Sequence, residues 1–163
     1  MNAPNLVAAE SRPGIIFVPY EPAHLKDLVL QPPQAALAEY MRGEGYAEAV
    51  ACGGQTTTAF DAQGRVLGIA GLLPQNPARA VAWALLADRP GGHLLAMTRR
   101  ARAGIEQGLK TYDRIETFVD PEWPAAVLWV RALGFDHPVR LPCYFPGRRA
   151  AVMFTRYAPG AVP

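Results

Sequence analysis

Residues 80–119 read AVAWALLADRPGGHLLAMTRRARAGIEQGLKTYDRIETFV, and this stretch decides the fold. Its first seven residues are apolar on both faces, which is typical of a central, buried strand. After the break at 88–92, apolar side chains recur at spacings of three and four, which predicts a helix. These side chains are Leu94, Met97, Ala101, Ile105 and Leu109. Residues 115–119 form a second strand, so we predict two parallel strands joined by a helix and splayed at the Gly91-Gly92 end.

The segments on either side complete the predicted order of elements. Downstream, we expect a helix over 121–133, opened by a proline and closed by Gly134, and then two strands over 141–145 and 150–157 around a Pro146-Gly147 turn. Upstream, a β-hairpin is expected from strands over 56–60 and 66–73 around an Asp-Ala-Gln-Gly turn, followed by a loop over 74–77. Only one parallel crossover is present, so the sheet is mixed and the fold class is α/β with α+β character.

The N-terminal third gives a weaker pattern. Residues 15–18 predict a strand, and 21–30 predict a helix stopped by Pro32 and Pro33. A second helical region is expected over 34–51, broken at Gly43 and Gly45. We expect residues 1–14 to be a flexible leader and 15–163 to be a single domain.

Composition narrows the class of protein. The chain has 163 residues, 50% of them hydrophobic and 18% charged, with a formal net charge of +2. That charge is too small to indicate nucleic-acid binding. No stretch approaches the roughly 20 apolar residues that span a bilayer. The two cysteines, Cys52 and Cys143, lack zinc-site spacing and predict reduced thiols in a cytoplasmic protein. Because no apolar stretch is long enough, we expect no membrane partner.

The order of elements resembles that of the GNAT acetyltransferases. These enzymes carry an Arg or Gln, two spacers, Gly, one spacer and Gly or Ala after the fourth strand, and Arg89-Pro90-Gly91-Gly92-His93-Leu94 stands there in this chain. Residues 126–135, AVLWVRALGF, resemble the penultimate helix of the family and its Leu-Gly-Phe ending. The segment 112–120 is also similar to small acetyltransferase-like phage proteins, some of whose relatives are internal virion proteins. The resemblance implies the GNAT fold, a central mixed twisted sheet with a splayed parallel pair and helices on both faces.

The resemblance also implies a site for acetyl coenzyme A. A helix N-terminus offers unpaired backbone N–H groups, and glycines let a diphosphate approach them closely. By resemblance, the amides of Gly91, Gly92, His93 and Leu94 would bind the diphosphate, and Arg89 would add charge. The alternative is a turn that only connects strand to helix. Leu94 stands where the family prefers Gly or Ala. The arginines at 99, 100 and 102 could meet the 3′-phosphate, although a solvated basic face is the simpler interpretation.

The usual catalytic groups of the family are missing. The fourth strand has no acid, Val130 stands at the position of the family's Tyr, and Trp123 stands at that of its Asn. Substitutes near the expected cleft are Asp88, His93, Glu116, Asp120, Glu122 and Tyr144. Among these we select Glu116 and Asp120 as candidate proton acceptors, because side chains four apart on a strand share a face. Both could equally be surface charges, and Cys143 has no adjacent base that would make it a nucleophile.

The expected function is acetyl-CoA-dependent transfer of an acetyl group to a small-molecule or peptide amine. The alternative is a non-catalytic phage protein, structural or host-interacting, that retains the fold in the virion or the host cytoplasm. A third possibility is nucleic-acid binding through the arginine-rich helix, but that helix lacks interleaved aromatic residues.

Trp129, at helical spacing with Ala126 and Leu133, is expected in the core.

Overall fold

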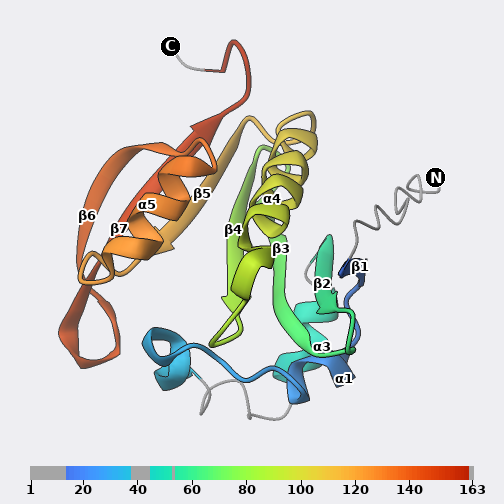
Figure 1. Cartoon of the computed structure of the whole chain (residues 1–163). Helices are drawn as coiled ribbons and strands as arrows, with labels where there is room; N and C mark the ends of the chain where they lie inside the picture. The colour runs from blue at the N-terminus through green and yellow to red at the C-terminus, as the bar shows by residue number, and fades with distance from the viewer. Residues whose placement is uncertain (1–13, 38–44, 53, 162–163) are drawn as a thin grey trace. The chain divides into compact units, whose positions relative to one another are not determined.

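A computed structural model describes residues 14–37, 45–52 and 54–161 of the chain (Figure 1). The expected leader therefore lies outside the described residues, except for Gly14. The elements are β1 (Ile15–Pro19), α1 (Pro22–Lys26), η1 (Pro32–Leu37), α3 (Tyr46–Cys52), β2 (Thr56–Asp61), β3 (Val66–Asn76), β4 (Arg79–Leu86), η2 (Gly91–His93), α4 (Leu94–Gly108), β5 (Arg114–Val119), α5 (Pro124–Ala132), β6 (Asp136–Phe145), η3 (Pro146–Arg148) and β7 (Arg149–Tyr157).

The strands join in one mixed seven-stranded sheet in the order β1-β2-β3-β4-β5-β7-β6. β4 is the fourth strand in this order, which confirms the central strand predicted from its apolar run. β4 and β5 run parallel, with Arg79, Ala80 and Val81 opposite Arg114, Ile115 and Glu116, and α4 connects them. The predicted α/β class and the strand-helix-strand unit are therefore confirmed. The parallel ladder ends at Val81, although β4 continues to Leu86.

The chain divides into two compact units, and the first comprises Met1–Ala70 and Ala84–His93. In it β1 pairs antiparallel with β2, from Ile15 opposite Asp61 to Pro19 opposite Thr57. Ile15, Phe17 and Ile69 are among its buried side chains. The predicted turn is confirmed: Gly64 has φ +77°, a left-handed conformation that favours glycine, and its amide donates to the carbonyl oxygen of Asp61.

Two predictions for this unit need correction. The expected helix over 21–30 is only the five residues of α1, because the chain turns at Asp27 and Leu30 then forms an antiparallel bridge with Ala87. Pro32 and Pro33 were expected to stop a helix, but they begin the 3-10 helix η1. Proline fits the first turn of a helix because its missing N–H has no partner there. The break at Gly45 is confirmed, whereas Gly43 lies outside the described residues.

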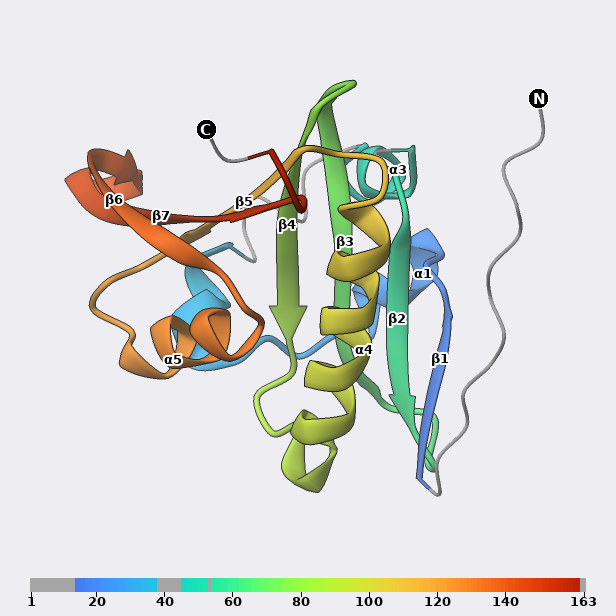
Figure 2. The ribbon, with the colours of Figure 1, turned by 90° about the horizontal axis from the view of Figure 1, so that it is seen from above.

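The second unit comprises Gly71–Trp83 and Leu94–Pro163. Its hydrophobic core contains Ile115 and Val119, which lie on one face of β5. They pack with Ile105 of α4, with Val130 of α5 and with Phe154 of β7. Helices α4 and α5 thus cover the same face of β5 and β7, and Figure 2 shows α5 along that face. Trp129 packs against this core, as predicted, and its Nε1 donates to the Thr98 hydroxyl at 2.8 Å.

Three boundaries in this unit differ from the prediction. β3 continues through Pro74 to Asn76, where a loop was expected, and the turn lies at 77–78 instead. α5 begins at Pro124 and not at residue 121, because Asp120 first turns the chain by accepting the Glu122 amide at 2.9 Å. β6 begins at Asp136, five residues before the predicted start at 141. Its side chains are mostly exposed, so the buried-face pattern that marks a strand in sequence is weak there.

Candidate functional site

The loop between β4 and α4 presents open backbone at two glycines. Gly91 has φ +57°, which favours glycine, and a Cβ atom placed on Gly91 or Gly92 would meet no atom within 4 Å. The His93 amide donates to the Pro90 carbonyl oxygen at 3.2 Å, so it closes the turn. Gly91 and Gly92 therefore precede α4 in the chain, and each has free space where another residue would carry a Cβ.

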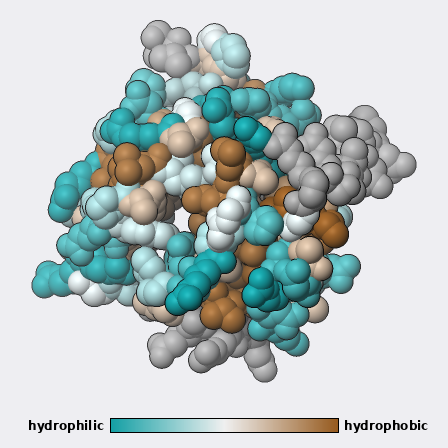
Figure 3. Space-filling model, in the orientation of Figure 1, coloured by the Kyte–Doolittle hydropathy of each residue, from teal (hydrophilic) through white to brown (hydrophobic). Residues whose placement is uncertain are grey.

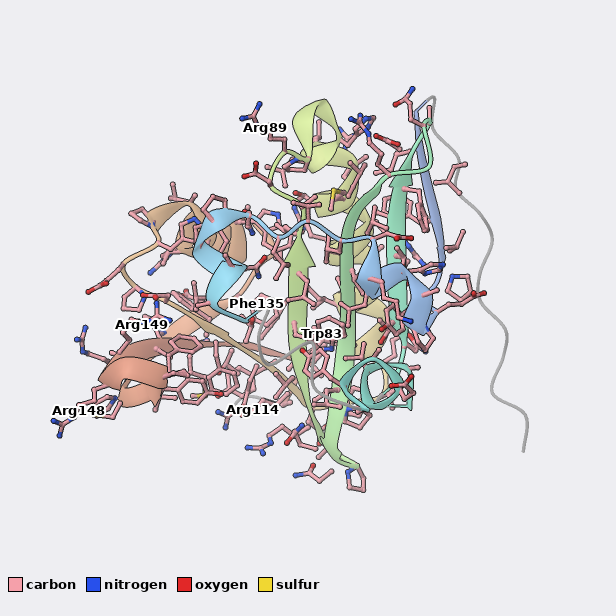
Figure 4. All side chains as sticks on the ribbon, turned by 90° about the horizontal axis from the view of Figure 1, so that it is seen from below. Trp83, Arg89, Arg114, Phe135, Arg148 and Arg149 are labelled. Atoms are coloured by element: carbon pink, nitrogen blue, oxygen red, sulfur yellow. The ribbon has the colours of Figure 1, made fainter. Side chains whose placement is uncertain are left out.

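The side chains around this loop differ in how they are held. The Arg89 side chain is 92% exposed, with Nε 3.7 Å from Asp88, and Figure 4 shows it projecting from the loop. The ring of His93 lies 3.2 Å from the position that a Cβ on Gly14 would take. Leu94 is 39% exposed, although the helical spacing placed it on the buried stripe. The exposed side chain of Arg89 can thus move toward an anion, whereas the His93 ring lies close to Gly14.

The three arginines of α4 lie at the second and third turns of that helix. Arg99 and Arg102 are exposed and Arg100 is half-buried. Within the described residues, none of the three forms a salt bridge. This agrees with a solvated basic face and leaves the guanidinium groups free to meet a phosphate.

Glu116, the first candidate proton acceptor, is buried between two arginines. It is 2% exposed, and its Oε1 lies 2.7 Å from Arg114 Nε and 3.5 Å from Arg79 Nη1. These three atoms are close enough to attract but poorly aligned for hydrogen bonds, because Glu116 Oε1 and the Nε atoms of both arginines are buried without a hydrogen-bond partner. Glu116 also lies within the paired part of β5, opposite Val81, and its burial shows that the alternative of a surface charge is wrong for this residue.

Asp120, the second candidate, lies at the edge of a pocket of about 280 Å³. The pocket is lined by Asp120, Pro121, Glu122, Arg140, Arg149 and Ala150. The Asp120 carboxylate accepts a hydrogen bond from Arg149 Nη1 and is 19% exposed. Figure 4 shows Arg149 beside its neighbour Arg148 at the β6–β7 end of this unit. Glu116 is not part of this pocket, so the structure does not bring the two candidates into one site.

The two arginines beside Glu116 were not predicted from the sequence. Alternation along β5 could have paired it with Arg114, two residues away on the same face, but Arg79 comes from β4. Tyr144, one of the possible catalytic substitutes, stacks on Phe118 with ring centroids 4.8 Å apart. Burial raises the pKa of Tyr144, and the negative charge of Glu116 raises it further. Tyr144 is therefore a neutral phenol at physiological pH.

The positions of the family's usual Tyr and Asn carry Val130 and Trp123 in this chain. Val130 is 5% exposed and belongs to the core, and Trp123 is the N-cap of α5. Cys143 is exposed and unpaired. In the described part of the chain, no three His, Cys, Asp or Glu side chains gather to hold a metal ion, and no helix is long and apolar enough to cross a membrane. On the face seen in Figure 3, hydrophobic patches alternate with hydrophilic ones.

Solved structures supply the comparison that identifies the fold. The chain is similar to the ribosomal-protein-S5-alanine acetyltransferase from Vibrio fischeri, at a TM-score of 0.69 and 10% identity over 96% of this chain and 100% of that one. The chain has the GNAT fold. A GNAT-family acetyltransferase from Bacillus anthracis gives a TM-score of 0.67 at 10% identity, over 94% of this chain and 98% of that one. Spermidine/spermine N-acetyltransferase from Vibrio cholerae gives 0.61 at 17% identity, over 89% and 93%.

These GNAT structures establish the fold and leave the activity to be argued from the residues, because all three share less than a fifth of their sequence with this chain. No protein-family model and no curated protein sequence matches the chain. None of the three structures is a phage protein, so the phage resemblance remains a prediction.

Proposed function

We propose that the protein is an acetyl-CoA-dependent N-acetyltransferase that acts on a small-molecule or peptide amine, with residues 15–163 as its single domain. The open Gly91-Gly92 backbone at the start of α4, directly after the central strand of a GNAT fold, is the observation that carries this proposal. The names of the Vibrio proteins support the substrate class, since one denotes a protein alanine and the other a polyamine.

The residues of the loop fit a diphosphate. Both glycines have free space where other residues carry a Cβ, and the N-terminal end of a helix attracts negative charge. In this proposal Gly91, Gly92 and Leu94 offer their amides and Arg89 swings in to add charge. His93 orients the turn, because its amide is already bonded to Pro90. The α4 arginines would then meet the 3′-phosphate.

Bound acetyl-CoA would supply the acetyl group as a thioester, whose carbonyl carbon the acceptor amine attacks. The amine must lose a proton, and we propose that Asp120 accepts it, because this carboxylate borders a pocket of about 280 Å³ that can hold a small amine. Glu116 is the less suitable of the two candidates, since it is buried and does not line this pocket. No acid is needed at Val130, because a thiolate leaving group can take its proton from water.

The alternative proposal is a non-catalytic protein that keeps the fold as a structural or host-interaction module, for example in a phage virion. The specific observation in its favour is that two of the family's catalytic positions carry Val130, which is buried in the core, and Trp123, the N-cap of α5. The enzyme proposal places the protein in a cytoplasm, that of the host if a phage encodes it, whereas the alternative also allows a place in the virion.

Calorimetry with acetyl-CoA tests the binding step. Gly92→Val should weaken binding at least tenfold, about 1.4 kcal/mol, because the side chain would occupy the space beside the amides. Gly104→Val is the matched control, since Gly104 also has no atom within 4 Å of its Cβ position but lies inside α4. Equal affinities of the two variants would contradict the proposed loop site.

Release of free thiol, measured against small amines and peptide N-termini, tests the chemistry. Asp120→Asn should lower kcat by about a hundredfold, in the range typical of general-base catalysis, and Glu116→Gln should stay within a few-fold of the wild type. Full activity of Asp120→Asn would remove this residue from the mechanism. A wild type that neither binds acetyl-CoA nor releases thiol would favour the non-catalytic alternative.

A further inference from the structure

The end of β4 is hydrogen-bonded by a segment that is not a strand. The Ala87 amide donates to the Leu67 carbonyl oxygen of β3, so odd-numbered residues in this part of β4 direct their backbone groups toward β3. Because these groups alternate along a strand, those of Ala84 and Leu86 point to the opposite edge. Residues 29–34 occupy that edge, with Leu30 in a bridge to Ala87.

The side chain of Gln34 fills the centre of this edge. Its Nε2 donates to the Ala84 carbonyl oxygen at 2.8 Å, and its Oε1 accepts the Leu86 amide at 2.9 Å. Gln31 supports it, because Gln31 Nε2 donates to Gln34 Oε1 at 2.9 Å and the Gln31 amide donates to the Leu86 carbonyl oxygen at 3.1 Å. One carboxamide thus replaces the N–H and C=O groups that a neighbouring strand would provide.

We infer that Gln34 is a displaceable plug that sets the affinity for the acyl carrier, an inference that rests on the proposed function. The edge closed by Gln34 leads along the chain directly to the Gly91-Gly92 loop proposed to hold the diphosphate. The arm of coenzyme A, which joins its diphosphate to its thiol, is an extended chain with two amides. Such amides can make the same two hydrogen bonds to Ala84 and Leu86, provided that the Gln34 side chain leaves.

A side chain is easier to remove from this edge than a strand. Gln34 makes two hydrogen bonds to β4, and a typical hydrogen bond contributes little net free energy because water replaces it when it breaks. The protein with the plug in place does not offer the edge, so the apparent dissociation constant for an amide-bearing ligand rises by the inverse of the open fraction. The nucleotide half of coenzyme A has no amide and is not affected.

The experiment compares two probes on the full chain by calorimetry: coenzyme A, and 3′-phosphoadenosine 5′-diphosphate, which keeps the diphosphate and lacks the amide arm. Gln34→Ala is expected to bind coenzyme A at least fivefold more tightly than the wild type and to bind the nucleotide within twofold. Gln34→Glu, which keeps the shape but cannot donate to the Ala84 carbonyl oxygen, should also bind coenzyme A more tightly than the wild type and the nucleotide within twofold. Gln107→Ala, an exposed glutamine on α4, is the control and should change neither.

The resonances of the Gln34 carboxamide give a second readout by NMR. In the free wild type the N–H proton donated to the Ala84 carbonyl oxygen should exchange slowly with water, and saturation with coenzyme A should abolish that protection. Unchanged protection in the complex, or a Gln34→Ala variant with equal or weaker affinity for coenzyme A, would overturn the plug.

Binding of coenzyme A by Gln34→Ala alone, with none by the wild type, would support the plug. A chain that binds neither probe, with or without Gln34, would refute the proposed function and the plug together. Nucleotide binding with an unaltered affinity of Gln34→Ala for coenzyme A would refute the plug alone.

Discussion

Each compact unit buries one strand carboxylate, Asp61 at the end of β2 and Glu116 in β5, and the two are held in opposite ways. Asp61 Oδ1 accepts the amides of Gln63 and Arg65 at 3.0 and 2.8 Å, and Oδ2 accepts Arg65 Nε at 2.7 Å. All its partners come from one turn. Glu116 has only guanidinium groups beside it, and one of them comes from another strand. Both carboxylate oxygens of Asp61 therefore accept hydrogen bonds from nearby residues. Glu116 is enclosed by charges from farther along the chain, and its Oε1 is buried without a hydrogen-bond partner.

The largest effect on stability is expected when Glu116 is replaced. Glu116→Gln should lower the free energy of unfolding by about 2 kcal/mol, because it leaves the two arginines without a compensating charge. This is less than for a fully buried pair, since the side chains of Arg79 and Arg114 are 42% and 36% exposed and water screens them. Urea denaturation measures the change. Glu122→Gln, at an exposed position, is the control and should cost under about 0.5 kcal/mol. Equal stabilities of the two variants would show that the arginines do not depend on Glu116.

The two arginines should differ from one another. Arg114→Gln should cost about 1 kcal/mol, and Arg79→Gln about half of that, because Arg114 Nε is the nearer group to Glu116 at 2.7 Å. Double-mutant cycles with Glu116→Gln separate each pairwise energy from packing, which matters because Arg114 also lies over the Tyr157 ring. A larger coupling for Arg79 than for Arg114 would contradict this ranking.

The smallest effect is a pH dependence from Asp61. Burial raises the pKa of this carboxyl, but hydrogen bonds from the Arg65 amide, the Arg65 side chain and the Gln63 amide outweigh burial and lower it below 3.8. A depressed pKa stabilises the fold above the unfolded pKa, near 3.9, and that contribution is lost as the pH falls through the lower folded value.

The difference in Tm between the wild type and Asp61→Asn should therefore be constant above about pH 5 and shrink below about pH 4. Circular dichroism between pH 2 and pH 7 measures it. Asp113→Asn, at an exposed position, is the control for changed surface charge. A difference in Tm that stays constant down to pH 2 would contradict the depressed pKa.

The same contrast explains what could be predicted from the sequence. The Asp61–Gly64 turn and the helix α4 were predictable because their contacts lie within a few residues, and apolar spacing reports such contacts directly. The parallel pairing of β4 with β5 followed from the single crossover. The pairing of Arg79 with Glu116 was not predictable, because it depends on the register between β4 and β5.

Prolines account for other differences between the predicted and the observed elements. Pro32 and Pro33 open a 3-10 helix, and Pro74 lies inside β3, although both sites were expected to interrupt structure. A proline excludes one conformation and one donor, and the neighbouring chain decides which allowed structure follows. At the candidate site, the glycine loop was predictable from its place between strand and helix. The role of Gln34 was not, because its partners Ala84 and Leu86 lie far along the chain.

The proposal that the Gly91-Gly92 loop binds acetyl-CoA is tested most directly by an NMR titration of the ¹⁵N-labelled protein. The amide resonances of Gly91 and Gly92 should shift and saturate at submillimolar acetyl-CoA, with the signal of the exposed Gly147 amide unchanged as an internal control. Resonances of both loop glycines that stay fixed at millimolar acetyl-CoA would contradict the proposal, whatever other signals move.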